Sequence, residues 1–385
     1  MRTITILVLA FLTLSGYSQI DPLLSPYYNN GLYSVVMDSN MTTSPDILIF
    51  RPSTSVGGPF PTVLFQPGAN SGTAYITKHS YDLYWQHLAS YGYVIIIMNN
   101  TSGGPNASLF PDMHNWIKTQ VNSGTGWLSE YVDLTRFIVS GHSNGGMNAT
   151  DIIIDRPSEI QAIVYLASYP NPGIFTIGAQ NVSNYNGKVM LMCGDEDETS
   201  VVFVGTTNEV AEDAYNTRFT SAACKSWVYL NGVGHGGFGD YNNPAQPVGS
   251  IGREPVTASI RHYIVSFLNS QFNYDAAAFD NFSQASLQPN STGEFGNNCG
   301  LVLNVNDEES NNEFTLYPNP ACEHINLKGI ETLTRVKISD MKGRLITEYV
   351  LTDDSQIDVS DLSSGIYLIN ISNHTRSFTK LFQKN

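Results

Sequence analysis

Ser143 lies at the centre of a Gly-x-Ser-x-Gly pattern at positions 141–145, between the apolar run 137–140 and a helix-competent segment. A turn that lifts a serine off a strand end crowds the residues two before and two after it, and glycine fits there because it has no Cβ. Such a turn also leaves the amide of Asn144 at the start of the helix, where it can donate to a developing oxyanion. The pattern therefore predicts that Ser143 is a nucleophile.

Candidates for an acid and a base follow Ser143 along the chain. Asp195 and Asp197 come just after one apolar run, and His235 follows another within a glycine-rich loop. A histidine can take the serine proton, and a carboxylate orients the imidazole and stabilises the imidazolium. The order nucleophile, acid, histidine is that of a serine hydrolase triad on an α/β sheet. A buried structural histidine is the other interpretation of His235.

Two further features near these residues are interpreted without a catalytic role. His142 adjoins the nucleophile, but the geometry of the turn is expected to direct its side chain away from Ser143. The acidic cluster 195–198 lacks the glycine and the alternating spacing of a calcium loop, so we expect no metal site.

These candidates require strands that end at one edge of a sheet. Eight short β-rich runs lie between Tyr33 and Leu230, at 33–37, 46–51, 62–66, 93–98, 136–140, 162–166, 189–193 and 226–230. Apolar residues recur at helical spacing over 81–89 and over 256–268. Near-continuous apolar strands alternating with helices indicate a mostly parallel eight-stranded sheet covered on both faces. The fold class is therefore α/β, with its site at the carboxyl ends of the strands.

Composition places the chain among globular proteins with more than one domain. It has 385 residues, of which 42% are hydrophobic and 11% aromatic, enough for a sizeable core. A net charge of −15 with only 19 Lys and Arg argues against nucleic acid or an anionic membrane as a partner, because both repel an acidic surface.

The N-terminus has the features of a secretory signal peptide. Arg2 precedes an apolar run from Ile4 to Leu14, and a small-x-small pattern with Gly16 and Ser18 follows it. A signal peptide over 1–18 and a mature start at Gln19 are therefore expected. The apolar run is too short to cross a bilayer, and no stretch of about 18 or more apolar residues follows it.

Export makes disulfides possible for the four cysteines, which show no zinc-like spacing. Three connectivities are open. We favour Cys224 with Cys299, because Cys322 lies in a different segment and Cys193 ends a strand that should be buried.

The motifs of the first 270 residues resemble those of α/β-hydrolases of the cutinase and polyester hydrolase type. The resemblance rests on 132–146 around the nucleophile, on 65–72 as the oxyanion loop and on 87–95 before the fourth strand, and it spans about Tyr33 to Leu268. It implies Ser143 as nucleophile, His235 as base, and the amides of Ala69 and Asn144 as the oxyanion hole. The family places its acid several residues past the strand end, which favours Asp197 over Asp195.

The expected substrate-binding residues of this chain differ from those of polyester hydrolases. Polyester hydrolases usually hold an aromatic residue beside the first oxyanion amide and a methionine after the nucleophile, where this chain has Ala69 and Asn144. The family's cleft tryptophan aligns with Tyr169, and Phe238 is expected to supply a second wall. Ordinary loop packing is the other interpretation of both aromatic residues. The segment 167–188 between the sixth and seventh strands has no long apolar insertion and little that could form a helical lid, so an open groove is expected.

A second domain is predicted at the C-terminus. From about 276 to 313 the chain loses apolar periodicity and gains Asn, Ser, Gly and acidic residues, as linkers do. Short alternating strands follow, at 314–320, 336–346 and 365–369, which indicate a small β-sandwich. These three motifs, together with Lys380 near the C-terminus, resemble the C-terminal sorting domain of the type IX secretion route. We expect a catalytic domain over 19–303, a linker over 304–313 and a sorting domain over 314–385.

The sequence as a whole predicts a secreted or cell-surface serine ester hydrolase that needs no cofactor. Its expected partners are an ester or polyester substrate and, through the C-terminal domain, the type IX secretion machinery, and we expect a monomer. A small-ester, acyl-sugar or lipid esterase of the same mechanism is the alternative, because the catalytic groups say little about the acyl or alcohol part. From another class, a surface-binding protein that has lost catalytic activity remains open.

Overall fold

The computed structural model describes residues 19–39, 43, 46–69, 76–99, 106–173, 178–201, 205–300, 315–330, 333–340, 344–372 and 377–385. The predicted signal peptide over 1–18 and the predicted linker over 304–313 lie outside these residues, as do residues 70–72 of the expected oxyanion loop.

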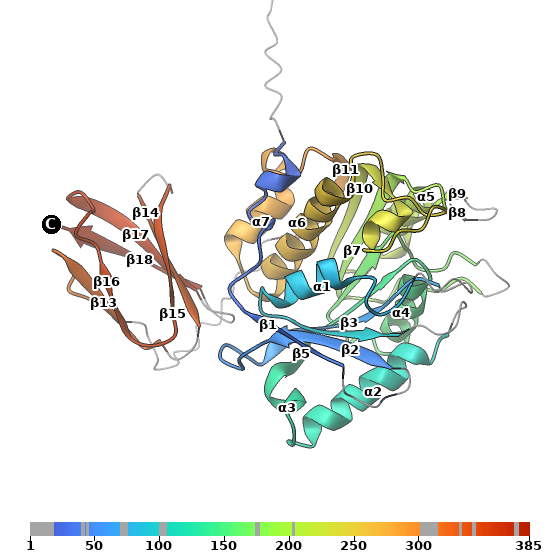
Figure 1. Cartoon of the computed structure of the whole chain (residues 1–385), viewed down its shortest axis with the longest axis horizontal. Coiled ribbons are helices and arrows are strands. Elements are labelled where there is room, and N and C mark those ends of the chain that lie inside the picture. The colour runs from blue at the N-terminus through green and yellow to red at the C-terminus, as the bar shows by residue number, and fades with distance from the viewer. Residues whose placement is uncertain are drawn as a thin grey trace, which may run out of the picture.

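One large sheet organises the first 300 residues (Figure 1), in the strand order β1-β2-β4-β3-β5-β6-β7-β10-β11. Its strands are β1 (Val35–Asp38), β2 (Ile47–Pro52), β3 (Phe60–Gln66), β4 (Val94–Met98), β5 (Val132–His142), β6 (Ala162–Leu166), β7 (Lys188–Glu196), β10 (Cys224–Gly234) and β11 (Thr292–Asn297). The six strands from β4 to β10 in this order are parallel. β1, β2 and β11 join antiparallel at the two edges.

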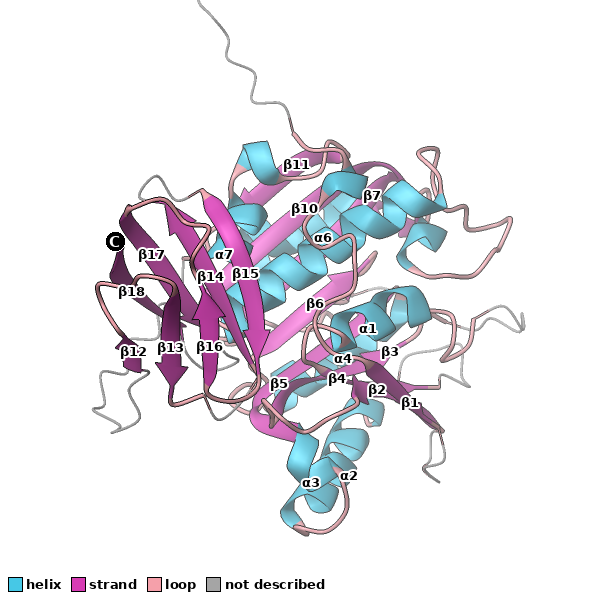
Figure 2. Ribbon diagram, turned by 60° about the vertical axis from the view of Figure 1, so that its left-hand side comes forward, coloured by secondary structure: helices cyan, strands magenta, loops and turns pink. Residues whose placement is uncertain are grey.

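Helices cover both faces of this sheet, as Figure 2 shows. The core on one face includes residues of α1 (Asp82–Ala89), α6 (Arg253–Phe272) and α7 (Ala276–Ser283). The core on the other face includes residues of α2 (Leu109–Asn122), α3 (Leu128–Tyr131), α4 (Asn144–Asp155) and α5 (Thr207–Asp213). Apolar residues on both sides of each central strand explain the near-continuous hydrophobic runs, because a parallel sheet is buried on both faces.

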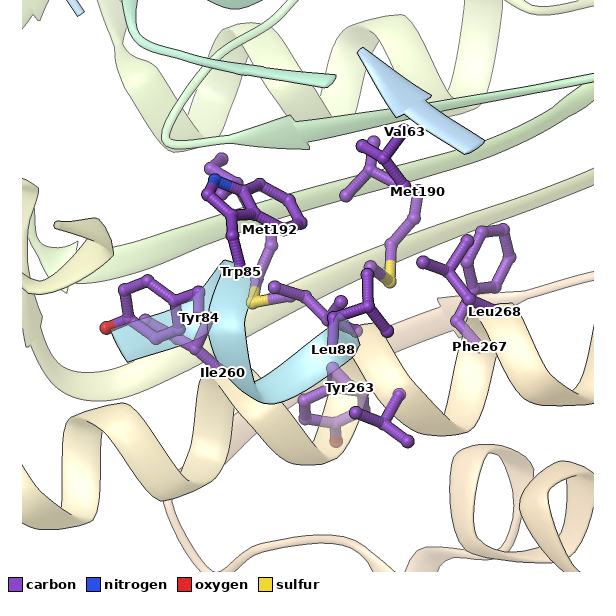
Figure 3. Packing of buried hydrophobic residues seen from close by; sticks show 14 of the residues in the cluster. Val63, Tyr84, Trp85, Leu88, Met190, Met192, Ile260, Tyr263, Phe267 and Leu268 are labelled. Carbon is purple, nitrogen blue, oxygen red and sulfur yellow. The ribbon is translucent and has the colours of Figure 1, made fainter. Parts of the chain in front are cut away.

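The core beneath α1 and α6 is closely packed (Figure 3). Trp85 and Leu88 of α1 meet Met190 and Met192 of β7, and Tyr263 of α6 lies beside them. None of these five side chains retains exposed surface. Each buried side chain of this size contributes roughly 1.5 to 3 kcal/mol relative to an exposed one. This packing fastens α1 and α6 to β7 of the sheet.

All eight predicted strands are present, and the sheet has a ninth that the sequence did not indicate. β11 and α7 lie within the region expected to be a linker from about 276, so that expectation is wrong for residues 276–297. The strand has the sequence TGEFGN and pairs with β10 at the sheet edge, where it is only partly buried. A glycine-rich edge strand carries little hydrophobic alternation, which explains why its pattern gave no signal.

A disulfide joins Cys224, the first residue of β10, to Cys299, just after β11. The favoured pairing is thus confirmed. Cys193 is a buried free thiol and Cys322 an exposed one. The bond fastens the last strand of the sheet to its neighbour.

The C-terminal residues form two antiparallel sheets around a core of their own. One sheet contains β12 (Thr315–Tyr317), β13 (His324–Lys328) and β16 (Ser355–Asp358); the other contains β15 (Leu345–Leu351), β14 (Thr334–Asp340), β17 (Gly365–Ser372) and β18 (Ser377–Lys384). Side chains from both sheets, including Ile325, Ile338 and Ile369, are fully buried together. This is the predicted small β-sandwich.

Candidate active site

Ser143 lies at a sharp turn between the end of β5 and the start of α4. Its φ of 53° and ψ of −124° are in a region that costs a non-glycine residue about 1 to 3 kcal/mol. A Cβ on Gly141 would lie 2.2 Å from the carbonyl carbon of Gly145, and a Cβ on Gly145 would lie 2.2 Å from the carbonyl oxygen of Gln66. At both positions a Cβ would collide with backbone atoms, so both residues must be glycine, as the spacing predicted.

Neighbouring strands hold this turn in place. The amide of Ser143 donates to the carbonyl of Leu166 at the end of β6, over 3.0 Å. The hydroxyl of Ser168 donates to the carbonyl of Ser143 over 2.5 Å. These bonds fix the backbone of Ser143 from the β6 side, so the strained conformation is maintained by its surroundings.

The loop after β3 passes beside the turn. A Cβ on Gly68 would lie 3.5 Å from the Cβ of Ser143. The Gly68 amide itself donates to the hydroxyl of Tyr81 over 3.0 Å, so its hydrogen already has an acceptor within the protein. Ala69 follows in the same loop and is half-buried. Asn144 begins α4, so its amide lies at the positive end of the helix dipole.

His235 and Asp197 form a buried pair at the carboxyl ends of two adjacent parallel strands. Asp197 directly follows β7, and His235 begins the 3₁₀ turn His235–Phe238 directly after β10. Asp197 Oδ2 lies 2.9 Å from His235 Nδ1, and the two side chains are 0% and 3% exposed. A carboxylate only accepts, so Nδ1 donates and Nε2 is the basic nitrogen. Nε2 has no hydrogen-bond partner among the described residues.

The two aspartates of this loop have different contacts. Asp195 Oδ1 accepts from the amides of Gly232 and Val233, over 2.6 Å and 3.3 Å, and thereby braces the end of β10. Asp197 Oδ1 accepts from the amide of Thr199 over 3.0 Å, which leaves Oδ2 for His235. Asp195 thus supports the loop, and only Asp197 contacts the histidine.

Arg253 holds the histidine loop through the loop's backbone, and no motif in the sequence predicts this contact. The Arg253 guanidinium at the start of α6 donates to the carbonyls of Gly236 and Tyr241 over 3.1 Å and 2.7 Å, and also to that of Gly239. A single arginine after a glycine is not part of any motif, so its contacts with three backbone carbonyls of one loop could not be predicted from the sequence.

His142 lies against His235. Its ring packs against the ring of His235 with the centroids 4.6 Å apart, and it is fully buried. Burial lowers the pKa of His142 well below its ordinary value, and the neighbouring His235 lowers it further, against a smaller opposing interaction with the backbone of His235. The direction of the His142 side chain relative to Ser143 stays a prediction, and the structure adds that the ring forms part of the surroundings of His235.

The two expected groove residues are both buried. Tyr169 is 7% exposed, and burial together with the nearby Asp197 charge raises its pKa well above the ordinary value. Phe238 is 0% exposed and lies nearly parallel to the His142 ring at 6.4 Å. The expectation that Phe238 forms a wall of the groove is therefore corrected, because its side chain packs into the core beneath His142 and presents no surface.

Within the described residues, no group of three or more His, Cys, Asp or Glu side chains is arranged to hold a metal ion. None of the helices that these residues form is both long and apolar enough to cross a membrane.

Comparison with known families agrees with the architecture on both sides of residue 300. Residues 62–246 match the model of the alpha/beta hydrolase family, and residues 315–385 match that of the secretion system C-terminal sorting domain. No curated protein is significantly similar to the chain. The sorting domain indicates a secreted or cell-surface protein that uses the type IX secretion machinery. The protein therefore combines an alpha/beta hydrolase family domain with a type IX C-terminal sorting domain, and this combination indicates a secreted hydrolase.

Proposed function

We propose that the protein is a serine hydrolase that cleaves carboxylic esters through an acyl-enzyme. The observation that carries this proposal is the buried Asp197–His235 pair, whose Nε2 has no partner among the described residues. It lies on the same sheet edge as the strained turn of Ser143, because β5, β7 and β10 run in parallel. Nucleophile, acid and base thus come from three strand ends in the triad order.

In this mechanism Ser143 Oγ attacks the ester carbonyl while His235 Nε2 takes its proton. The carboxylate of Asp197 stabilises the imidazolium, and the amides of Ala69 and Asn144 donate to the oxyanion. His235 then returns the proton to the alkoxide leaving group, which departs as the alcohol and leaves an acyl group on Ser143. Water, activated by His235, releases the acid and restores the serine. Every proton in the cycle moves through His235, so no cofactor is required.

The substrate class is proposed to be an ester that an uncovered site can admit, including cutin-like or aromatic polyesters. Residues 167–187 supply no helix between β6 and β7 among those described, which supports an open approach. Tyr169 is the proposed aromatic contact, and an aromatic pair contributes about 1 kcal/mol beyond area burial. We propose a monomer whose catalytic domain spans 19–303.

A second candidate is an esterase for small soluble esters. It is favoured by the burial of Phe238 and by Ala69, because a single, mostly buried Tyr169 offers little aromatic surface for a polymer. Release of aromatic diacid from a polyester film, compared with hydrolysis of p-nitrophenyl butyrate, separates the two candidates. Activity on the soluble ester without any release from the film would select the second.

Substitution of the triad tests the proposal itself. Ser143→Ala and His235→Ala are each expected to lower kcat on p-nitrophenyl butyrate by at least about 10³, because triad members act as a unit. An organophosphate should label Ser143 alone, and Ser143→Ala should abolish labelling. The matched control Ser129→Ala removes an exposed hydroxyl whose contact is the carbonyl of Gly126. Ser129 is in α3, before the amino end of β5, whereas Ser143 follows the carboxyl end of that strand, so kcat should be unchanged. Retention of more than about a tenth of the activity by either triad variant would refute the assignment.

A further inference from the structure

A buried hydroxyl lies between the oxyanion side and the histidine side of the site. Tyr81 is fully buried at the start of α1, and its ring packs edge-on against Phe65 of β3 at 4.7 Å. Its hydroxyl oxygen lies 3.0 Å from the amide nitrogen of Gly68 and 2.8 Å from Nδ1 of His142. One atom of Tyr81 therefore contacts both the loop that precedes Ala69 and the residue that precedes Ser143.

The hydrogen-bonding capacity of these groups fixes where the protons are. The Gly68 amide can only donate, so the hydroxyl of Tyr81 accepts from it. Burial raises the pKa of Tyr81 well above the ordinary value, so the phenol keeps its proton. That proton has Nδ1 of His142 as its acceptor, since the alternative would leave a buried hydroxyl proton unpaired at a cost of about 1 to 3 kcal/mol. Nδ1 of His142 then carries no proton, and the ring proton is on Nε2, which has no hydrogen-bond partner among the described residues. The opposite tautomer would leave both the Tyr81 hydroxyl proton and Nε2 without a partner, so the Nε2–H form is the better paired of the two.

The state of His142 matters because its ring touches that of His235, with centroids 4.6 Å apart. A second cation there would oppose the imidazolium that His235 forms in the proposed reaction. Tyr81 favours the neutral ring, because it offers a donor to the nitrogen that would otherwise take up a proton. The same hydrogen bond fixes the rotation of the His142 ring, and the His235 ring packs against that ring.

We propose that Tyr81 is a positioning residue. Its hydroxyl holds His142 neutral, in the Nε2–H form, behind His235. The same hydroxyl also binds the Gly68 amide and thereby holds the oxyanion loop. This rests on the proposed function, because it assigns Tyr81 a role in the orientation of His235 and of the Ala69 amide. Tyr81 touches neither substrate nor reacting atoms; it acts through Gly68 and His142.

Tyr81→Phe tests the proposal in the full-length chain. Kinetics on p-nitrophenyl butyrate are expected to show kcat reduced about tenfold to hundredfold, as for small misplacements of catalytic groups, with KM within about twofold. The matched control is Tyr263→Phe, which removes an equally buried hydroxyl, bonded over 2.7 Å to Thr292 Oγ1 in the same core. It should show a similar loss of melting temperature and an unchanged kcat. Equal kcat values for the two variants would overturn the proposal.

A spectroscopic measurement separates this proposal from the proposed function. In protein labelled with ¹⁵N-histidine, the His142 signal, assigned by its loss in His142→Asn, should show an unprotonated Nδ1 in the parent chain and in Ser143→Ala. The same signal should change in Tyr81→Phe. A protonated Nδ1 in the parent would overturn the role of Tyr81 even if Ser143 is the nucleophile. Full activity of Ser143→Ala would instead overturn the proposed function and leave the protonation result standing.

A second pair of variants covers the case in which Tyr81→Phe does not fold. His142→Asn keeps an acceptor oxygen near the place of Nδ1, whereas His142→Leu has a similar volume and no acceptor. The Asn variant should retain at least about tenfold more kcat than the Leu variant, because only the latter leaves the Tyr81 hydroxyl without an acceptor. Equal activity of the two variants would contradict the proposal.

Discussion

Replacement of Asp197 by Asn should separate the two aspartates of the loop after β7. At the 2.9 Å between Asp197 Oδ2 and His235 Nδ1, a carboxylate and an imidazolium attract each other by about 6 kcal/mol at an effective dielectric constant of about 20. At about 1.36 kcal/mol per power of ten, loss of that attraction lowers kcat by about 10⁴. The introduced amide would also keep its oxygen on the Thr199 amide and turn its NH₂ toward His235 Nδ1. The histidine proton would then move to Nε2, and the base facing the serine would be lost.

Asp195→Asn is the matched control, because it changes the same charge two residues away. Its remaining oxygen can still accept from the amides of Gly232 and Val233, so kcat should fall by less than about threefold and stability by about 1 kcal/mol. Steady-state kinetics on p-nitrophenyl butyrate and thermal melts of both variants provide the comparison. A larger kcat loss in Asp195→Asn than in Asp197→Asn would refute this reasoning.

Three further outcomes are expected. Deletion of 314–385 should leave kcat and the melting temperature of the hydrolase part nearly unchanged while export in the native host fails, because each part has its own core; an insoluble or inactive truncation would contradict this. Cys224→Ser should lower the free energy of unfolding of the hydrolase part in guanidinium chloride by about 4 kcal/mol, as expected for a bond that closes a separation of 75 residues. Cys322→Ser, at an exposed free thiol, is its control and should change nothing. Tyr169→Ala should reduce release from an aromatic polyester film more than hydrolysis of p-nitrophenyl butyrate, and equal losses would make Tyr169 a packing residue only.

Local pattern in the sequence was enough to predict the central sheet and the residues at its strand ends. Runs such as 94–98 are apolar throughout because both faces of a parallel strand are buried, and this property is visible without any tertiary contact. The glycines around Ser143 were equally predictable from their spacing, although a Cβ on Gly141 would collide within the turn and a Cβ on Gly145 would collide with the end of β3. His235 could be singled out because it follows the eighth predicted strand in a glycine-rich loop. The edge strand β11 could not be predicted, because its partly exposed, glycine-rich residues carry no periodic hydrophobic signal.

The tertiary structure alone decided which side chains meet. Asp195 and Asp197 are two residues apart and chemically identical, and only the register between β7 and β10 brings the second one to His235 while the first braces a backbone turn. Phe238 is three residues from His235, but the 3₁₀ turn directs it into the core. The contact of Tyr81 with Gly68 and His142 joins three segments that are remote in sequence. Such contacts depend on how the strands and α1 pack together. Because the packing energy is distributed over the whole core, no local sequence pattern predicts these contacts.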